Sequence, residues 1–383
     1  MTRPPLPQML TTALSRWTLL LPPLAAVLLA LVWGRTLPNA VAALAGLVLV
    51  LAVLAAVHHA EVVAHRVGEP LGSLVLAVAV TVIEVALIVT LMVDSAAKNA
   101  TLARDTVFAA VMITCNGIVG LCLLLGSLRT RVAVFNPEGT GAALATVATL
   151  ATLSLALPSF TTSTPGPDFS PTQLTFASVA ALVLYGLFVT TQTVRHREYF
   201  LPPELIDRPT ADDRHGEIHG GTHDGTHDEL PSTRETTTSL VLLMVALVAV
   251  VGLAKTVSPT IERGVTAAGL PASVMGVVIA MLVLLPETIA AVRAAKRDEV
   301  QTGLNLALGS AMASIGLTIP SVALASIWLS GPLVLGLGAS HLVLLALTVA
   351  VGTLTVIPGR ATPLQGGVHL SVLAGYVVLA VSP

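Results

Sequence analysis

Two glutamates lie deep inside long apolar segments of this chain. Glu84 follows LVLAVAVTVI and Glu287 follows GVVIAMLVLLP, whereas most of the 21 acidic residues lie in polar stretches or at the ends of apolar runs. A charged side chain at the centre of a membrane helix costs about 2.5–3.5 kcal/mol on insertion scales. We therefore expect Glu84 and Glu287 to have a function. The alternative is an isolated structural acid held by a neighbouring hydroxyl.

A pair of facing carboxylates suits a hard divalent cation. Ca²⁺ takes six to eight oxygen ligands at about 2.3–2.6 Å, and two ionised glutamates would neutralise its charge. Without the cation, the two negative charges repel each other and are poorly solvated, so protons should take its place. Competition between protons and a cation for one carboxylate pair is the chemistry of an antiporter.

Neighbouring polar groups could complete the coordination shell. Thr81 precedes Glu84 by about one helical turn and should share its face. Pro286 has no N–H, so we expect the carbonyl of Leu282 to be free to turn toward an ion. Polar residues also interrupt the apolar segments that follow each glutamate. For these, the alternative is a role in helix–helix contact. The full set of further candidate ligands is Thr81, Asn116, Leu282, Ser310 and Ser314.

The elements that must position these residues are transmembrane helices. Hydrophobic residues make up 54% of the chain and charged residues 10%, against roughly a quarter charged in soluble domains. About 20 apolar residues cross a bilayer core. The sequence therefore predicts an all-α integral membrane protein of eleven spans, at residues 17–33, 38–57, 71–93, 105–128, 139–157, 173–194, 238–258, 271–293, 302–328, 333–357 and 364–383.

The chain contains a weak internal repeat. Glu61 and Gly68 enclose six residues, as do Glu262 and Gly269, and an apolar segment carrying Glu84 or Glu287 follows each glycine. Five spans per repeat would reverse the direction of the second unit, an arrangement typical of secondary transporters. The predicted units are an N-terminal helix, two inverted five-helix repeats and a polar linker between the repeats: 1–37, 38–194, 238–383 and 195–237.

The basic residues predict an orientation. With a cytoplasmic N-terminus and alternating sides, fourteen of the 19 Lys and Arg residues fall in cytoplasmic segments and five on the opposite side. An excess of Lys and Arg marks cytoplasmic loops. We therefore expect the N-terminus in the cytoplasm and the C-terminus outside.

Histidines recur every four residues in the polar linker, within RHGEIHGGTHDGTHDEL. On a helix this spacing would align imidazoles for a transition metal, but the interleaved glycines oppose a stable helix. A solvated linker is the default interpretation, and a weakly metal-binding or pH-sensing loop is the alternative. The residues concerned are His215, His219, His223 and His227.

These residues resemble the ChaA-type calcium (cation)/proton antiporters of bacteria, a branch of the calcium/cation antiporter superfamily. The resemblance covers nearly the whole chain and is clearest in HHAEVVAHRVGEPLG, LLPETIAAV, LNLALGSAMASIGLTIP and GGVHLSVLAGYVV. It implies a ten-helix core of two inverted repeats, one peripheral helix and a location in the bacterial inner membrane. By motif position it also implies Glu84 and Glu287 as cation and proton ligands. The chain departs from the superfamily in lacking Gly-Asn shortly before each glutamate.

The predicted function is secondary active exchange of cytoplasmic Ca²⁺ for external protons by alternating access. The alternative on the same fold is exchange of Na⁺ or K⁺ for protons. A membrane-embedded enzyme or a channel is a less favoured hypothesis. We expect no enzymatic activity and no cofactor. The expected partners are inorganic cations, protons and the lipid bilayer. The net charge of −2 says nothing about nucleic acid, but no basic cluster suggests such a partner, and the oligomeric state is left open.

Overall fold

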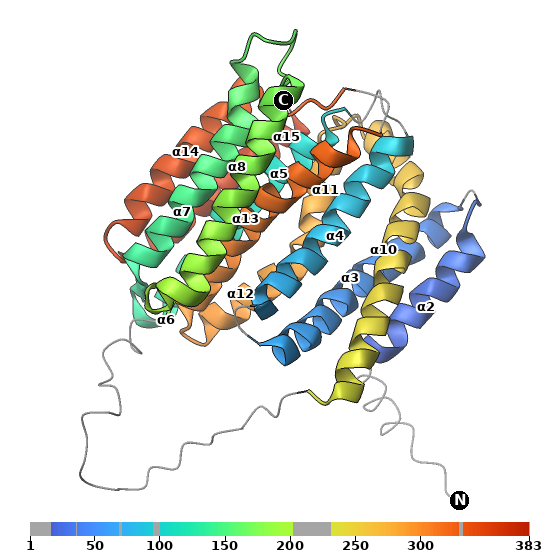
Figure 1. The fold of residues 1–383 in the computed structure, drawn as a ribbon, viewed down its shortest axis with the longest axis horizontal. Coiled ribbons are helices and arrows are strands. Elements are labelled where there is room, and N and C mark those ends of the chain that lie inside the picture. The colour runs from blue at the N-terminus through green and yellow to red at the C-terminus, as the bar shows by residue number, and fades with distance from the viewer. Residues whose placement is uncertain are drawn as a thin grey trace, which may run out of the picture.

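The fold of the chain is given by a computed structural model that describes residues 17–35, 37–68, 71–94, 100–201, 231–328 and 332–382. The described part is a bundle of long helices that run side by side (Figure 1). The helices of the N-terminal part are α2 (Trp17–Val32), α3 (Asn39–Val67), α4 (Leu71–Asp94), α5 (Leu102–Met112), α6 (Val119–Thr130), α7 (Pro137–Ala151) and α8 (Pro171–Thr190). Those of the C-terminal part are α10 (Thr233–Ala267), α11 (Val274–Val283), α12 (Leu285–Lys296), α13 (Val300–Ala325), α14 (Ala339–Val356) and α15 (Pro363–Val381).

Short irregular turns extend several of these helices. The π-turn η1 (Ile113–Ile118) joins α5 to α6 as one continuous span. A second π-turn and a 3₁₀ turn continue α7, and a third π-turn continues α8 into a final 3₁₀ turn: η2 (Thr152–Ala156), η3 (Leu157–Ser159), η4 (Thr191–Arg195) and η5 (Arg197–Phe200). The only strands in the described ranges are β1 (Ala133–Val134) and β2 (Arg360–Ala361), which pair antiparallel.

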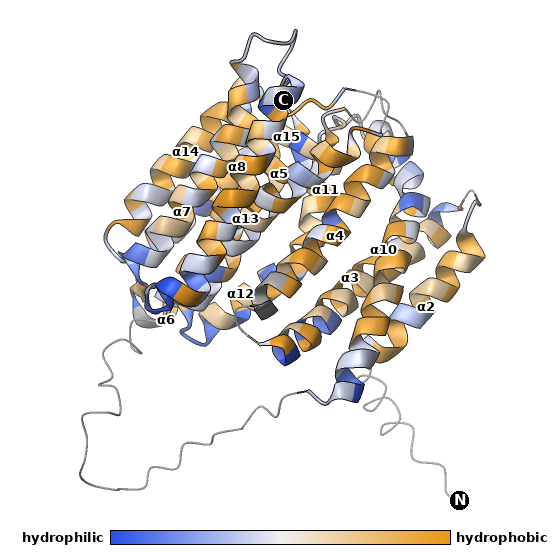
Figure 2. Cartoon of the chain, viewed as in Figure 1, coloured by the Kyte–Doolittle hydropathy of each residue, from blue (hydrophilic) through white to orange (hydrophobic). Residues whose placement is uncertain are grey.

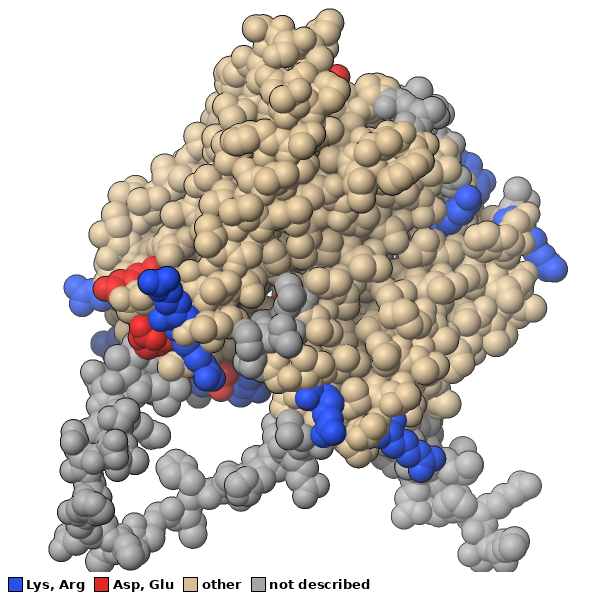
Figure 3. All heavy atoms as spheres, in the orientation of Figure 1, with Lys and Arg blue, Asp and Glu red and all other residues tan. Residues whose placement is uncertain are grey.

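The helices match the predicted all-α membrane architecture. Nine helices among the described residues are long and apolar enough to cross a bilayer, and ten if α11 and α12 form one broken span. The predicted first span, α2, is a shorter apolar helix of 16 residues. Apolar residues cover the middle of the bundle (Figure 2), and the charged side chains in view lie near its two ends (Figure 3).

The predicted span 271–293 is broken rather than straight. α11 ends at Val283, α12 begins at Leu285, and the two helix axes differ by 55°. Pro286 explains the break, because its ring cannot donate to the Leu282 carbonyl and displaces the preceding turn. The break places Glu287 in the first turn of α12.

The glycine turns predicted before both glutamate helices are present. Gly68 has φ +76° and Gly269 has φ +68°, a left-handed conformation that glycine adopts without a Cβ penalty. Several helix boundaries differ from the prediction. α3 continues to Val67, well beyond the predicted end at 57, and α14 begins at Ala339 rather than at 333. α10 continues through Pro259 to Ala267, so Glu262 lies inside this helix, and α10 begins at Thr233, within the predicted linker.

Helices from the two parts of the chain interleave. α3 packs along α10, α4 packs on α13, and α11 and α12 pack on α5 and α6. α8 also packs on α13, and α15 packs on α6. If α3 and α10 are counted as the first helices of the two halves, the third helices are α5–η1–α6 and α13. Each of these contacts the second and fifth helices of the other half, as a two-fold relation between the halves would produce. The division into inverted repeats stays a prediction that this pattern supports.

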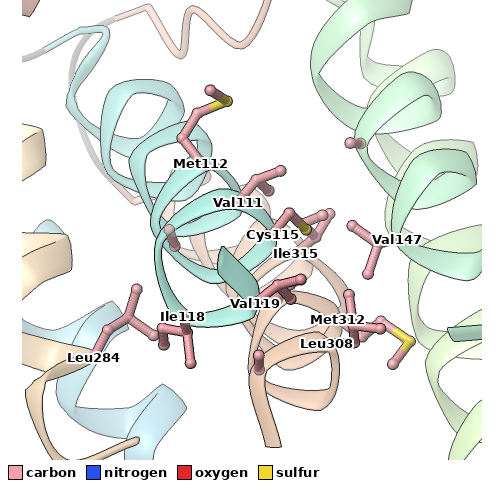
Figure 4. Packing of buried hydrophobic residues seen from close by; sticks show 14 of the residues in the cluster. Val111, Met112, Cys115, Ile118, Val119, Val147, Leu284, Leu308, Met312 and Ile315 are labelled. Carbon is pink, nitrogen blue, oxygen red and sulfur yellow. The ribbon is translucent and has the colours of Figure 1, made fainter. Parts of the chain in front are cut away.

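The continuous span α5–η1–α6 forms the centre of the larger apolar core. Figure 4 shows its side chains packed against α13, α7 and the α11–α12 break, with Met112, Cys115, Val119, Val147, Leu284, Leu308, Met312 and Ile315 among those drawn. α15 approaches this span closely through glycine. A Cβ on Gly366 would lie 2.7 Å from the Leu124 nitrogen and 2.9 Å from the Gly120 oxygen.

Two adjacent glycines of α15 test this close approach. We expect Gly366→Ala to destabilise the protein by about 1–3 kcal/mol, because the added methyl overpacks a backbone contact. The matched control is Gly367→Ala, since a Cβ on Gly367 meets no atom within 4 Å, and alanine there should be neutral or slightly stabilising. Thermal unfolding of the purified proteins in detergent measures both. Equal unfolding midpoints for the two variants would contradict the predicted packing of α15 on α6.

Candidate functional site

Glu84 and Glu287 line one cavity inside the bundle. The cavity has a volume of about 420 Å³, and its walls come from α4, α8 with η4, α12 and α13. Both side chains are buried, with 2% of Glu84 and 9% of Glu287 exposed. Among the described residues that line the cavity, Glu84 and Glu287 are the two with ionisable acidic side chains.

Two hydroxyls on α13 hold one oxygen of Glu84. Ser314 Oγ and Thr318 Oγ1 each donate to Glu84 Oε2 at 3.0 Å. Residues four apart share a helix face, so both hydroxyls reach the same oxygen. Ser314 lines the cavity, whereas Thr318 is fully buried and lies outside its lining. Within the described chain, no group donates a hydrogen bond to the other oxygen, Oε1.

Glu287 is held in a different way. It lies in the first turn of α12, directly after the break at Leu284 and Pro286. Free N–H groups give a helix N-terminus a partial positive charge, which favours a nearby carboxylate. Its Oε2 is buried and, among the described groups, lacks a hydrogen-bond partner. Each glutamate therefore keeps one oxygen without a donor.

The described residues that line the cavity offer oxygen ligands and include no Lys, Arg or His. The hydroxyls of Thr81 and Ser310 line it beside the two carboxylates. No group of three or more His, Cys, Asp or Glu side chains that could hold a metal occurs in the described ranges. The polar groups that line the cavity are thus two carboxylates with neutral hydroxyl and amide groups, and such oxygens are the ligands that hard cations take.

The structure separates the predicted ligands into two groups. Thr81, Ser310 and Ser314 line the cavity with the two glutamates. The predicted ligand at Leu282 is its backbone carbonyl, and the side chain of this residue packs among apolar side chains of the α3–α10 side. Asn116 donates to Thr348 and is paired with His369, and neither Asn116 nor Leu282 lines the cavity. The linker histidines His215, His219, His223 and His227 lie outside the described residues.

Sequence analysis missed Thr318 and the wall formed by α8. Thr318 follows Ser314 by four residues, and this spacing could have indicated it. Tyr185, Phe188 and Gln192 of the α8 segment also line the cavity. Helical spacing carries no signal for them, because only the tertiary packing of α8 on α13 brings them to the glutamates.

The cavity extends from the glutamates to one end of the bundle. Its lining on α13 runs from Thr302, near the start of the helix, to Ser314, about 18 Å at 1.5 Å per residue. Gln192 lines the same end from η4, just before the linker between the two halves. The polar side chains Gln192, Thr302 and Asn305 make this end suitable for a hydrated ion.

Comparison with known proteins gives matches over nearly the whole chain. The sequence profile of the sodium/calcium exchanger protein family matches residues 37–194 and 238–382. The protein y4hA of Sinorhizobium fredii is 44% identical over 371 residues, which cover 96% of each chain. The sodium-potassium/proton antiporter ChaA of Escherichia coli is 32% identical over 365 residues, covering 94% of this chain and 95% of ChaA.

Solved structures share the fold at low sequence identity. Native YfkE superposes with a TM-score of 0.67 at 14% identity, covering 94% of this chain and 97% of YfkE. The H⁺/Ca²⁺ exchanger CAX superposes with a TM-score of 0.66 at 16% identity, covering 95% of this chain and 92% of CAX. With both halves matched by the family profile and a relative 32% identical over most of its length, the chain belongs to the sodium/calcium exchanger protein family.

Proposed function

We propose that this multi-pass membrane protein exchanges a cation for protons, with Glu84 and Glu287 binding either one. The observation that carries the proposal is that both buried carboxylates line one cavity and each keeps an oxygen without a donor among the described residues. A buried carboxylate without compensation is unfavourable. A bound cation or a proton on each carboxyl provides that compensation, and the pair therefore alternates between two neutral states.

Charge balance links the two ions. Ca²⁺ neutralises both carboxylates, and two protons do the same, so exchange of one Ca²⁺ for two protons leaves the charge of the site unchanged. A state with neither ion leaves two like charges in an apolar bundle, where their repulsion is poorly screened. Because that empty state is unfavourable, the site is expected to reorient across the membrane only when loaded. This coupling distinguishes an antiporter from a channel.

Alternating access requires the cavity to open to one side at a time. We place the N-terminus in the cytoplasm of a bacterial cell, because fourteen of the 19 Lys and Arg residues then fall in cytoplasmic segments. Gln192 and Thr302, at the polar end of the cavity, lie on that side. The conformation described is then the one that receives the cytoplasmic cation.

Ca²⁺ is the first candidate for the transported cation, because two carboxylates match its charge and hard oxygen ligands match its preference. Na⁺ or K⁺ is the second candidate. One observation favours it: ChaA of Escherichia coli, 32% identical to this chain, is named a sodium-potassium/proton antiporter. The same carboxyl pair could hold a monovalent cation if one carboxyl kept its proton.

Removing either carboxylate should abolish coupled exchange. We expect Glu84→Gln and Glu287→Gln each to lower proton-driven cation uptake, on the order of 10–100-fold or more for a group at a metal site, because glutamine cannot neutralise the ion or release a proton. Uptake into everted vesicles with an imposed acid interior measures the effect. Glu138→Gln, at an exposed position in the first turn of α7, is the control. Full proton-driven uptake of every cation in either site variant would refute the two-carboxylate mechanism.

The identity of the ion requires a direct comparison. In the same vesicles, an acid interior should drive uptake of ⁴⁵Ca²⁺. The interior should become more alkaline as Ca²⁺ enters, and a protonophore should change the time course of this pH change. Uptake of ²²Na⁺ or ⁸⁶Rb⁺ (a K⁺ substitute) without Ca²⁺ uptake would replace the first candidate with the second. Uphill movement of none of these ions under a pH gradient would contradict antiport altogether.

The hydroxyl of Thr318 provides a test that leaves both carboxylates in place. Thr318→Val keeps the side-chain shape and removes a hydrogen bond to a charged group, worth about 1.5–3 kcal/mol. We expect the KM for the cation to rise roughly tenfold or more, since 1.4 kcal/mol is a factor of ten in affinity. Thr146→Val on α7 is the control, because that exposed hydroxyl donates only to the Ala142 carbonyl of its own helix. An unchanged KM would show that Thr318 does not hold Glu84 for binding.

A further inference from the structure

A second group of buried polar side chains lies away from the glutamate cavity. It consists of Asn116 on η1, Thr348 and Thr355 on α14 and His369 on α15, which we call the Asn116 cluster. Each of the four is at most 4% exposed, and none lines the cavity of Glu84 and Glu287. The proposed exchange chemistry does not use them, so their burial in an apolar core requires another explanation.

The hydrogen bonds of the cluster have a defined direction. Asn116 Oδ1 can only accept, so His369 Nδ1, 3.3 Å away, carries a proton. In a neutral imidazole Nε2 then accepts from Thr355 Oγ1 at 3.2 Å. Asn116 Nδ2 donates to Thr348 Oγ1 at 2.9 Å, and that hydroxyl donates to Met112 Sδ at 3.5 Å. With the imidazole neutral, each donor in this chain of hydrogen bonds has an acceptor.

The composition of the cluster excludes two roles. It contains no carboxylate, and the adjacent cavity, lined by Thr348, Thr355 and His369, has a volume of about 20 Å³, space for roughly one water molecule. It therefore has neither the charge nor the room for a second cation. The chain also ends on the sulfur of Met112, which cannot pass a proton on. The cluster is not a proton path to the glutamates.

The position of the cluster points to a mechanical role. η1 is a π-turn, an irregularity that occurs frequently at functional sites. On one side it contacts α14 and α15 through Asn116, and on the other it packs against α12 and α13. α12 carries Glu287, and α13 carries Ser314 and Thr318. The cluster therefore fixes the element that packs against α12 and α13, two of the helices that form the walls of the cavity.

Close packing fixes the geometry of His369 as well. A Cβ on Gly120 would lie 3.1 Å from the Cβ of His369 and 3.1 Å from the Gly366 oxygen. Glycine at this position of α6 therefore allows α15 to come near enough for the imidazole to reach Asn116. In a low-dielectric interior, a fully satisfied polar network specifies one arrangement, because any shift leaves a buried group unpaired.

We infer that Asn116 and His369 are positioning residues of the exchanger, which hold η1 against α14 and α15. They thereby set the positions of Glu287 and of the two α13 hydroxyls that donate to Glu84. The inference rests on the proposed function for its consequence in transport. Its structural part, the effect of the cluster on the two glutamates, can be measured without transport.

Two variants with matched controls test the inference. His369→Leu and Thr348→Val each break the cluster and leave the glutamates in place. Ser371→Ala on α15 and Thr353→Val on α14 are the controls, because these exposed hydroxyls donate only to carbonyls of their own helices. Thr348→Ser keeps the hydroxyl and should restore the behaviour of the unmodified protein. Thermal unfolding and size exclusion in detergent select the variants that fold.

The first measurement is labelling of Glu84 and Glu287 by dicyclohexylcarbodiimide, quantified for each residue by mass spectrometry. We expect the labelling rate of at least one glutamate to change severalfold in His369→Leu and Thr348→Val and to stay unchanged in both controls and in Thr348→Ser. The second measurement is cation exchange in vesicles, in which the KM should rise more than the maximal rate falls, because positioning affects binding first.

The outcomes separate this inference from the proposed function. Labelling rates and KM values equal to those of the unmodified protein, in folded His369→Leu and Thr348→Val, would overturn the positioning role. If the unmodified protein exchanges no cation, the proposed function fails, and the labelling measurement still decides whether the cluster positions the glutamates. If His369→Leu does not fold, the comparison of Thr348→Val with Thr348→Ser decides.

Discussion

The structure depends on the burial of two carboxylates in an apolar bundle. Neither Glu84 nor Glu287 has enough donors to satisfy both of its oxygens within the described chain, and an unsatisfied buried charge is among the least favourable groups in a protein. The surroundings compensate in part, with two hydroxyls at Glu84 and a helix N-terminus at Glu287. In the proposed function, the oxygens that remain bind a cation or protons.

The broken helix and the polar face of α13 follow from this constraint. A straight helix would hold Glu287 among saturated backbone groups, whereas the break at Pro286 places it in the first turn of a new helix, whose N-terminus favours a carboxylate. On α13, Ser310, Ser314 and Thr318 lie four residues apart and form a polar stripe along one face of the helix. Burial of Ser314 and Thr318 costs little, because both hydroxyls donate to the carboxyl group of Glu84. Both features are thus local responses to the same two acids.

The two halves share their order of helices but differ in their polar contacts. α13 gives its hydroxyls to Glu84. The corresponding span of the first half, α5–η1–α6, contains a π-turn and directs Asn116 to Thr348 instead of to Glu287. Glu287 therefore relies on the backbone, where Glu84 relies on side chains. This asymmetry implies that the two carboxyls contribute differently to one site, although both line the same cavity.

The sequence by itself determined that the chain is a helical membrane protein, the order of its helices and the glycine turns at Gly68 and Gly269. It also identified Glu84 and Glu287 as the acids whose burial in the membrane is most unfavourable. Each follows from composition or from the position of a residue within its own helix. Only the tertiary structure decided that Ser314 reaches Glu84 while Asn116 turns to Thr348 and His369, and that α8 closes the cavity. The physical reason is that helical periodicity specifies which residues share a face, whereas the neighbour of that face is set by packing between helices distant in the chain.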